Sequence, residues 1–596
     1  MKVMKIKIKQ IVLAGLAGCA ISAATTACTD TWDDHYEAVA EGVNSGSLWQ
    51  AIKSNPDLSN FASVIEACGY DKSLASSQVF TVFAPTNASF SQAEADELIR
   101  QYNSEKGKVS EEDNTVIKEF LQNHIALYNY SVSKSSSDSI VLMNGKYAVL
   151  STGQINGTPM LTTNALYENG VLFTVGDQVP YFPNLFEYLR KDADFDSLRN
   201  FLYCGDTLNS DRSYPLFYYK EFLPSRSVPG GIENGKTIYL DSVFAQNNKL
   251  FGYNFLDAQL FSEDSTYWMV APTNQVWQSL IEDYSKCFNY DDNVEDRDSL
   301  AYTNTRLAIV QGTIFSKTFN PQLGTAVVPD SVMSTSAVMN YSRRRSTWGS
   351  DTLCYYQYFN PSAAGGIFEG TTAVECSNGQ MLKADTWNFD PRQTFNKIII
   401  VEAERQSSIK EVSRQPDSHG DSLGTISPTT RYVESVNEYY NKVSNNGFVE
   451  FVPASSTVNH YVTFNITDVL SNTGYDIYLV TAPALANDSN ATEIQRLPTL
   501  LRCTLGYNNQ AGRHQERQLV SSVNTGDDKL GYSPDSVNWI KLADDFKFEV
   551  SSYGLVEDNP QVTLKVETRV SNAQQRNNQY TRTMRIDCIV LKPHEE

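Results

Sequence analysis

Apolar residues recur three or four positions apart in two similar stretches of the chain. LWQAIKSNPDLSNFASVIEACG occupies 48–69, and LFEYLRKDADFDSLRNFLYCG occupies 185–205. This spacing places the apolar side chains on one face of a helix, and NPDL or DADF interrupts it. Each stretch therefore predicts two short amphipathic helices that end at Cys-Gly. The matching apolar positions are Leu48, Ile52, Phe61 and Ile65 in the first copy and Leu185, Leu189, Leu198 and Leu202 in the second.

The tetrapeptide Ala-Pro-Thr-Asn also occurs twice, at 84–87 and 271–274, each time after a continuous apolar run. Such a run predicts a strand that is buried on both faces. Proline ends the strand because it has no N–H to donate, and Thr86 and Thr273 stand where a helix N-cap is expected. The motif has neither a base nor a metal ligand at a fixed spacing, so it is interpreted as a structural joint.

Further segments repeat in the same order. The segment 114–132 corresponds to 304–321, and each copy then has an Asn-Gly turn before a strand, at 168–176 and 377–387. Asn-Gly between apolar alternations predicts a two-residue β-hairpin. The shared order of these features predicts a duplicated domain.

Together, the helix pair, the joint, the downstream segment and the Asn-Gly strand resemble the fasciclin domain. The resemblance covers about 45–182 and 183–405. It implies two tandem, compact α+β domains with no known catalytic centre.

The second copy departs from this pattern. Thr313 stands where the first copy has His124, and extra residues occur at 206–260 and 320–375. We expect these insertions to lie on the surface or to form small elements of their own.

The pattern changes to alternating strands towards the C-terminus. The segment 406–430 is rich in Ser, Asp, Gly and Pro, which predicts a linker. Alternation without helical periodicity then predicts an all-β sandwich at 431–596, similar to jelly-roll or galactose-binding-like modules. The predicted fold class is α+β: two tandem fasciclin-like domains followed by an all-β sandwich.

Three aromatic residues of the sandwich are candidates for carbohydrate binding. Tyr507, Tyr532 and Trp539 stand in predicted loops beside Asn and Asp. A flat ring can bury the C–H face of a sugar while amides and carboxylates bind its hydroxyls. The alternative is that these rings pack in the core or at its rim.

Charge and motifs narrow the function classes. The 596 residues carry 69 Asp and Glu against 48 Lys and Arg, a formal net charge of −21. This balance repels phosphate backbones, so we expect no nucleic-acid partner. The His residues lack metal-ligand spacing, and the acid-rich segment 289–300 lacks the Gly and final Glu of a calcium loop. No catalytic motif is found, so we expect no metal, no cofactor and no enzyme activity.

The N-terminus is typical of an export signal. MKVMKIKIKQ precedes an apolar stretch, and polarity returns at CTDTWDDHY. Residues 1–27 resemble a bacterial lipoprotein signal, with lipid on Cys28 and a tether at 28–44, and the acids after Cys28 resemble the surface-export signal of Bacteroidota lipoproteins. Cys19, after LAG, is the alternative lipidation site. A secretory signal that is cut without lipidation is a second alternative.

These features predict a non-enzymatic lipoprotein, exposed on the cell surface at the outer membrane, that serves adhesion or protein and glycan recognition. The alternative is an accessory glycan-binding subunit of a TonB-dependent polysaccharide uptake system. Its partners would be polysaccharide, the TonB-dependent transporter and the lipoprotein lid of that transporter.

Overall fold

The computed structural model consists of two compact units, Met1–Phe182 and Pro183–Glu596. The division falls where the repeat predicts a boundary.

No helix among the described residues is both long and apolar enough to span a bilayer. The predicted signal segment, with Cys19 and Cys28, lies outside the described residues. The structure describes residues 43–111, 113–132, 137–203, 218–222, 228–233, 236–241, 244–252, 256–316, 330–336, 338–341, 352–354, 356–416, 423–425, 428–453, 457–555 and 562–595.

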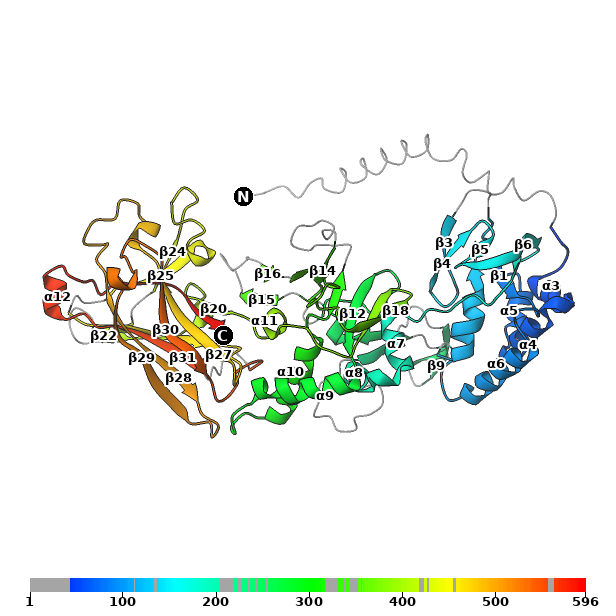
Figure 1. Ribbon diagram of the computed structural model, residues 1–596, viewed down its shortest axis with the longest axis horizontal. Helices are drawn as coiled ribbons and strands as arrows, with labels where there is room; N and C mark the ends of the chain where they lie inside the picture. The colour runs from blue at the N-terminus through cyan, green and yellow to red at the C-terminus, as the bar shows by residue number, and fades with distance from the viewer. Residues whose placement is uncertain are drawn as a thin grey trace. The chain divides into compact units, whose positions relative to one another are not determined.

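The first unit packs short helices against a seven-stranded sheet of order β2-β1-β7-β6-β5-β4-β3 (Figure 1). A bridge between Ala126 and Leu142 brings the end of β3 beside β2. The elements are α3 (Leu48–Ser54), α4 (Ser59–Cys68), α5 (Asp71–Ala75), α6 (Gln92–Glu105), β1 (Phe80–Pro85), β2 (Ile125–Leu127), β3 (Ser137–Val141), β4 (Tyr147–Ser151), β5 (Gln154–Ile155), β6 (Thr158–Tyr167) and β7 (Gly170–Val175).

The second unit begins with the same central pairing. Strand β12 lies between β13, which is antiparallel to it, and β19, which is parallel. In the first unit β1 lies in the same way between β2 and β7. The sheet order is β17-β14-β13-β12-β19-β18. The elements are α7 (Leu185–Lys191), α8 (Asp196–Leu202), α9 (Asn274–Tyr284), α10 (Arg297–Val310), α11 (Pro391–Thr394), β12 (Tyr267–Pro272), β13 (Ile314–Ser316), β14 (Ser331–Ser334), β17 (Gln357–Phe359), β18 (Thr371–Cys376) and β19 (Gly379–Ala384).

The asparagine of Ala-Pro-Thr-Asn joins the end of the buried strand to the helix pair. Asn87 accepts a hydrogen bond from the N–H of Asn60 at 3.1 Å, and Asn274 accepts one from the N–H of Ser197 at 2.8 Å. Each amide also donates to a carbonyl at the interruption of its helix pair, at 2.8 and 2.9 Å. The side chain thus bonds to the backbone of its own unit in both copies, as a structural joint requires.

The predicted N-cap position is right for Thr273 and wrong for Thr86, and the threonine hydroxyl makes no capping hydrogen bond in either copy. Helix α6 begins at Gln92, and Ser91 caps it in a capping box with Glu94. Thr273 occupies the N-cap position of α9, but its side chain makes no capping hydrogen bond.

A buried asparagine in each Asn-Gly hairpin binds three backbone groups. Asn169 accepts from the first N–H of α3 at 2.8 Å and donates to two carbonyls before β1, at 2.9 and 2.8 Å. Asn378 makes the same three bonds to α7 and to the segment before β12, at 2.9, 2.8 and 2.9 Å. The partners are Leu48, Leu74 and Ser76 for Asn169, and Leu185, Leu260 and Ser262 for Asn378.

Glycine follows each of these asparagines because the central strands approach closely. Gly170 and Gly379 have φ values of +148° and +138°. A Cβ would lie 1.9 Å from the carbonyl oxygen of Phe80 at the first position and 1.7 Å from that of Tyr267 at the second. Any other residue would push the two strands apart.

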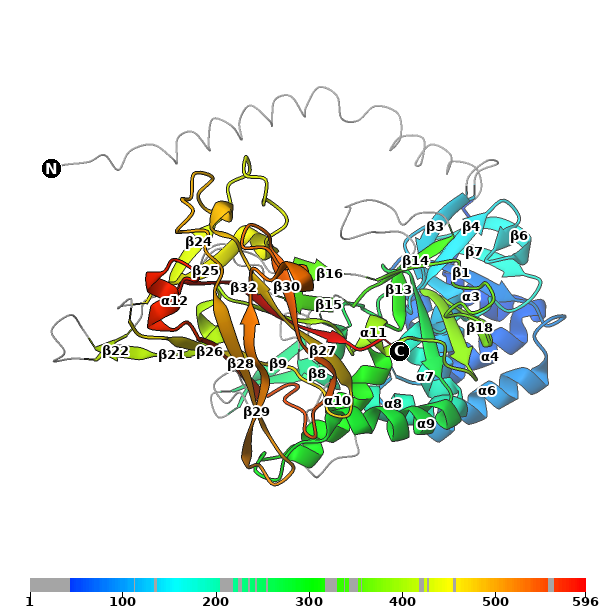
Figure 2. The ribbon, with the colours of Figure 1, turned by 60° about the vertical axis from the view of Figure 1, so that its left-hand side comes forward.

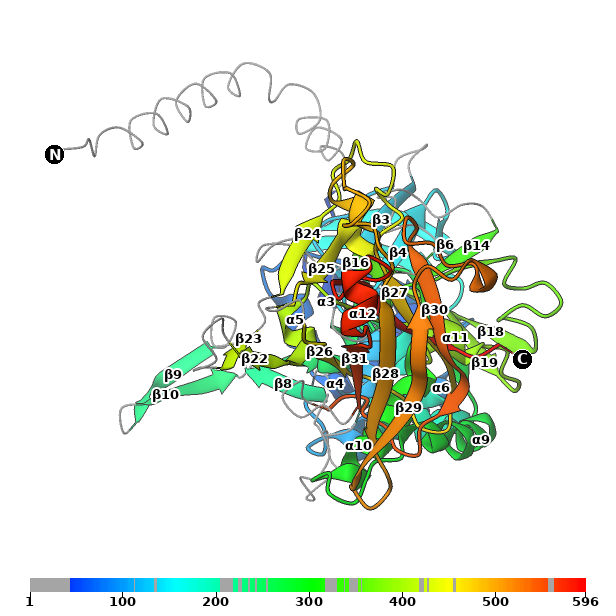
Figure 3. The ribbon, with the colours of Figure 1, turned by 90° about the vertical axis from the view of Figure 1, so that its left-hand side faces the viewer.

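The insertions of the second copy form small elements of their own. The segment 206–260 contains two antiparallel ribbons, β8–β11 and β9–β10, and Figure 3 shows β9 beside β10. The segment 320–375 adds β14, β17 and β18 to the sheet and the ribbon β15–β16. The new bounds are β8 (Tyr218–Phe222), β9 (Val228–Glu233), β10 (Lys236–Asp241), β11 (Phe244–Asn248), β15 (Val338–Tyr341) and β16 (Thr352–Cys354).

The C-terminal part is a sandwich of two antiparallel sheets (Figure 2), so the predicted α+β class with a β-rich C-terminal part is confirmed. We name the sheet of order β24-β25-β32-β27-β30, with β20 also paired to β32, the platform sheet; the other has the order β21-β26-β31-β28-β29. Their bounds are β20 (Ile399–Glu402), β21 (Ile409–Val412), β24 (Thr429–Tyr432), β25 (Gly447–Phe451), β26 (Tyr461–Ile466), β27 (Gly474–Thr481), β28 (Leu500–Asn508), β29 (His514–Asn524), β30 (Asn538–Lys547), β31 (Val562–Thr568) and β32 (Met584–Pro593).

The sandwich begins before the predicted linker 406–430. Strand β20 pairs with β32 in one sheet, and β21 pairs with β26 in the other. Two short strands, β22 (Arg414–Pro416) and β23 (Leu423–Thr425), form a ribbon after β21. The prediction of a linker is therefore wrong for 409–412, 414–416, 423–425 and 429–430, because backbone pairing outweighs the polar composition there.

Candidate functional site

Tyr507 lies on the core side of β28, not in a loop. Its ring packs edge-on against Phe546 and Phe548, with ring centroids 5.6 and 6.1 Å away. The next residue, Asn508, donates from Nδ2 to Oδ2 of Asp291 at 3.1 Å. Tyr507 therefore stands where the sandwich meets the segment after α9, and its ring is half-buried.

The acid-rich segment 289–300 holds the sandwich against the rest of the second unit. Asp291 is fully buried, and Asn289 donates from Nδ2 to the carbonyl of Glu549 at 3.0 Å. The hydroxyl of Tyr290 donates to the carbonyl of Tyr553 at 2.8 Å. We call residues 289–293 the clamp, since their polar groups bond across this junction.

Tyr532 lies in the loop between β29 and β30. Its N–H donates to the carbonyl of Asp527 at 3.0 Å, and its half-buried ring packs against the sandwich core. Tyr532 and Tyr507 thus have the packing role that the alternative interpretation gave them. The structure does not bring the three predicted aromatic residues together as one site.

Trp539 is different, because it lies on the outer face of β30. Ile540 and Leu542 point into the core, so Trp539 and Lys541 point away from it. The indole is 52% exposed, and it meets the ring of Tyr478 edge-on at a centroid distance of 5.8 Å. We name Trp539 and Tyr478 the aromatic corner; the sequence analysis did not single out Tyr478.

Charged groups adjoin the aromatic corner along the same two strands. Asp476 accepts from Nζ of Lys541 at 3.0 Å and lies 2.8 Å from Nδ1 of His594. Burial alone would raise the pKa of Asp476, but hydrogen bonds from His594 and Lys541 outweigh it and lower the pKa to about 2. The carboxylate is therefore ionised, and its hydrogen bond raises the pKa of His594.

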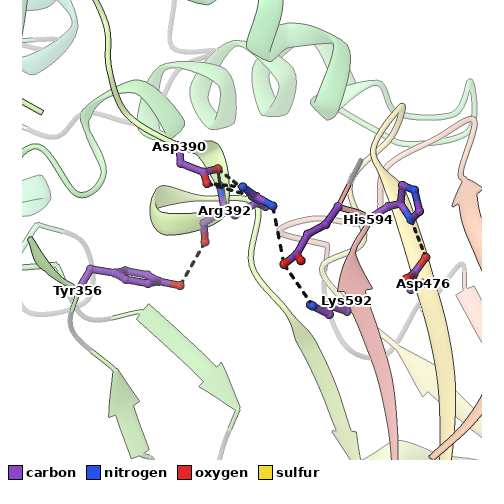
Figure 4. Close-up of polar contacts among 7 residues, drawn as sticks. Tyr356, Asp390, Arg392, Asp476, Lys592 and His594 are labelled. Carbon is purple, nitrogen blue, oxygen red and sulfur yellow. Dashed lines mark hydrogen bonds and ion pairs between the residues drawn. The ribbon is translucent and has the colours of Figure 1, made fainter. Parts of the chain in front are cut away.

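Figure 4 shows this end of the platform sheet facing the segment that contains α11. Arg392 forms an ion pair with Asp390, and its guanidinium lies 3.8 Å from a carboxylate oxygen of Glu595. Lys592 pairs with the same carboxylate at 3.2 Å. The contact between Arg392 and Glu595, like the clamp, connects the sandwich to the part of the second unit that precedes it.

A second polar group lies on the platform sheet, where β20 meets β32. Glu402 and Asp587 are 3% and 1% exposed, and their carboxylate oxygens and Sγ of Cys588 all lie within 4.8 Å of one another. Asp587 accepts from the N–H of Ser444 at 3.0 Å, and Glu404 accepts from Nδ2 of Asn445 at 2.9 Å. We name Glu402, Glu404 and Asp587 the acid cluster.

The acid cluster was missed because its members are far apart in the sequence. Two signals could have pointed to it. Glu402 interrupts an otherwise apolar run, and so does Asp587 in MRIDCIVL. A carboxylate on a buried strand is rare unless something compensates its charge.

Comparison with known proteins finds a family match within the first unit. Residues 56–179 match the family model of the fasciclin domain. None of the curated proteins matches the chain.

Three solved structures are similar to parts of the chain. One is a FAS1 domain pair from the insect cell adhesion molecule fasciclin I, with 10% identity, coverage of 58% of this chain and 97% of that one, and a TM-score of 0.17. Another is the CBM22-1 xylan-binding domain of Paenibacillus barcinonensis Xyn10C, with 9% identity, 34% and 97% coverage and a TM-score of 0.20. The third is a family 11 carbohydrate-binding module from Clostridium thermocellum, with 10% identity, 33% and 97% coverage and a TM-score of 0.17. These TM-scores are too low to support an argument about function.

Proposed function

We propose that this protein is a non-enzymatic, cell-surface adhesion and recognition protein whose sandwich binds glycan at the aromatic corner. In this proposal the chain is anchored in the outer membrane by a lipid on Cys28, or alternatively on Cys19. The residues from 183 to the start of β20 act as a second fasciclin-like domain. The fasciclin match at 56–179 supports the adhesion class, and the second copy repeats the strand pairing and the asparagine contacts of the first.

The exposed indole of Trp539 carries the glycan part of the proposal. A tryptophan normally buries most of its large apolar surface, whereas this one is 52% exposed on a regular strand. Tyr478 supports one edge of it. The ammonium of Lys541 and the carboxylate of Asp476 follow along the same face. A ring face next to polar groups suits the alternating C–H and O–H surface of a sugar.

The test is a titration of the full chain with a panel of polysaccharides, comparing wild type with Trp539→Ala. Tyr432→Ala is the matched control, since Tyr432 is 48% exposed on β24 at the opposite edge of the platform sheet. We expect Trp539→Ala to weaken binding by about fivefold or more, taking the about 1–3 kcal/mol of a base stacked on an aromatic ring as the scale. Tyr432→Ala should bind as wild type does. Equal binding by wild type and Trp539→Ala would remove the aromatic corner from the proposal.

The alternative function is that of an accessory glycan-binding subunit beside a TonB-dependent transporter and its lipoprotein lid. It uses the same aromatic corner and differs in its partner. Pull-down from detergent-solubilised native membranes separates the two functions. Recovery of the transporter pair with the wild-type protein favours uptake, and its absence favours adhesion.

A further inference from the structure

The acid cluster places two buried carboxylates, Glu402 and Asp587, near a third, Glu404. Burial raises the pKa of Asp587 well above its usual value; the N–H of Ser444 lowers it, and the charges of Glu402 and Glu404 raise it further. Burial also raises the pKa of Glu404 to about 7. Carboxylates gathered in a buried place repel one another unless a proton or a positive charge lies between them.

Two oxygens of the cluster have no partner among the described residues. Oδ1 of Asp587 and Oε2 of Glu404 are buried and receive no hydrogen bond. Asp587 is 1% exposed, so bulk water does not readily compensate its oxygen. A buried carboxylate oxygen without a donor is costly, and the cost is removed when the oxygen coordinates a cation.

We propose that Glu402 and Asp587, whose carboxylate oxygens lie within 4.8 Å of each other, bind one divalent cation of the oxygen-preferring class, such as Ca²⁺, with the neighbouring Glu404 as a further ligand. The cation fixes loop 433–446 onto the platform sheet. The donor set consists of carboxylate oxygens, which hard cations prefer. Sγ of Cys588 is also close, but carboxylates predominate among the donors, so the site favours Ca²⁺ or Mg²⁺ over a thiolate-binding metal such as Zn²⁺.

The loop is coupled to the cluster by direct contacts. Ser444 donates from its N–H to Asp587 and from its hydroxyl to Glu402, the latter at 2.6 Å. Asn445 and Asn446, with φ values of +52°, turn the chain sharply at this point. A cation on the three acids would hold the groups to which Ser444 and Asn445 bond, and so would order the loop.

The same loop reaches the strand that carries Trp539. The hydroxyl of Tyr439 donates to the carbonyl of Asp535, four residues before Trp539. Tyr439 also packs in one apolar cluster with Phe448, and Val537 contacts that cluster. Cation binding is therefore expected to slow hydrogen exchange throughout 433–446. The proposal does not depend on glycan binding, because the acid cluster exists whether or not the aromatic corner has a ligand.

The experiment uses the full chain, stripped with a chelator and dialysed, and titrated with Ca²⁺ in a calorimeter. We expect one site in the wild type. Asp587→Asn and Glu404→Gln should each weaken binding by at least tenfold, because each removes a charged ligand. The control is Asp544→Asn, since Asp544 is an acid on β30 whose side chain is 67% exposed; it should bind as wild type does. Mg²⁺ and Zn²⁺ titrations establish the class of metal.

Thermal unfolding tests the proposal even where a variant binds no cation. Without cation, Asp587→Asn should melt at or above wild type, because an amide cannot repel Glu402 and Glu404. With saturating Ca²⁺ the wild type should melt several degrees higher than without it, and higher than Asp587→Asn. The proposal is overturned if the stripped wild type binds no divalent cation, or binds Zn²⁺ alone. It is also overturned if Ca²⁺ leaves hydrogen exchange in 433–446 unchanged.

Discussion

Substitution of the hairpin asparagine should destabilise one unit at a time. Asn169→Ala removes three hydrogen bonds and leaves the N–H of Leu48 buried without an acceptor. An unsatisfied buried donor costs about 1–3 kcal/mol, and each carbonyl that loses a donor about 0.5–1.5 kcal/mol. The bond to Ser76 is only part-buried, so we expect the free energy of unfolding of the first unit to fall by about 2–4 kcal/mol. Asn378→Ala should lower that of the second unit by a similar amount.

Differential scanning calorimetry of the full chain, with hydrogen exchange to assign each transition, measures both effects. Asn169→Asp keeps the acceptor for Leu48 but places a carboxylate oxygen against two carbonyls, so it should be at least as destabilising as Asn169→Ala. Asn103→Ala, at an exposed position of α6, is the control and should change stability by less than about 0.5 kcal/mol. The reasoning is refuted if Asn169→Ala behaves like this control, or if Asn169→Ala and Asn378→Ala lower the same transition.

Three other positions give further predictions. Burial lowers the pKa of His124 to about 4, so stabilisation present above pH 6.5 should be lost as the pH falls towards 4, by up to about 3 kcal/mol. Urea unfolding of the wild type and His124→Gln at pH 7 and 4.5 measures this loss, which should be smaller in the variant. Asp291→Ala leaves the amide of Asn508 without its acceptor, and should lower the free energy of unfolding of the second unit by about 1–3 kcal/mol while sparing the first; calorimetry shows whether it does. Gly379→Ala forces Cβ against the backbone of β12 and should cost more than about 2 kcal/mol; a variant that melts as wild type does would contradict the close approach.

The sequence predicted the repeated helices and strands well because each of them depends on residues that lie close together in the chain. The helix pairs follow from apolar spacing, and the buried strands from continuous apolar runs that end at proline. The cap predicted at Thr86 was wrong because several polar residues compete within a few positions. In the first copy Ser91 bonds to the helix N-terminus in a capping box with Glu94, so the helix starts later than Thr86 would require.

Long-range pairing set the limits of prediction in the sandwich. Strand β21 spans only Ile409–Val412 in a polar setting, so its place in a sheet depends on β26 and not on its own sequence. The acid cluster likewise forms only when β20 pairs with β32.

The alternation of the sequence could have distinguished the packed ring of Tyr507 from the exposed ring of Trp539. Tyr507 alternates in phase with Leu505 of the core, whereas Trp539 alternates out of phase with Ile540. Placing both in loops concealed this difference.

The way the chain enters the sandwich has a mechanical consequence. Strand β20 runs antiparallel to β32 from the pair Ile399–Leu591 to the pair Glu402–Cys588. Tension applied through the preceding chain acts along β20, so it shears this ladder and loads all its hydrogen bonds together instead of unzipping them one by one. The clamp attaches the same two parts at a second place and shares the load. If the sandwich is attached to the surface on its N-terminal side and also binds a ligand, a force between the two would pass through the β20–β32 ladder. The sandwich would therefore bear that force before its sheets separate.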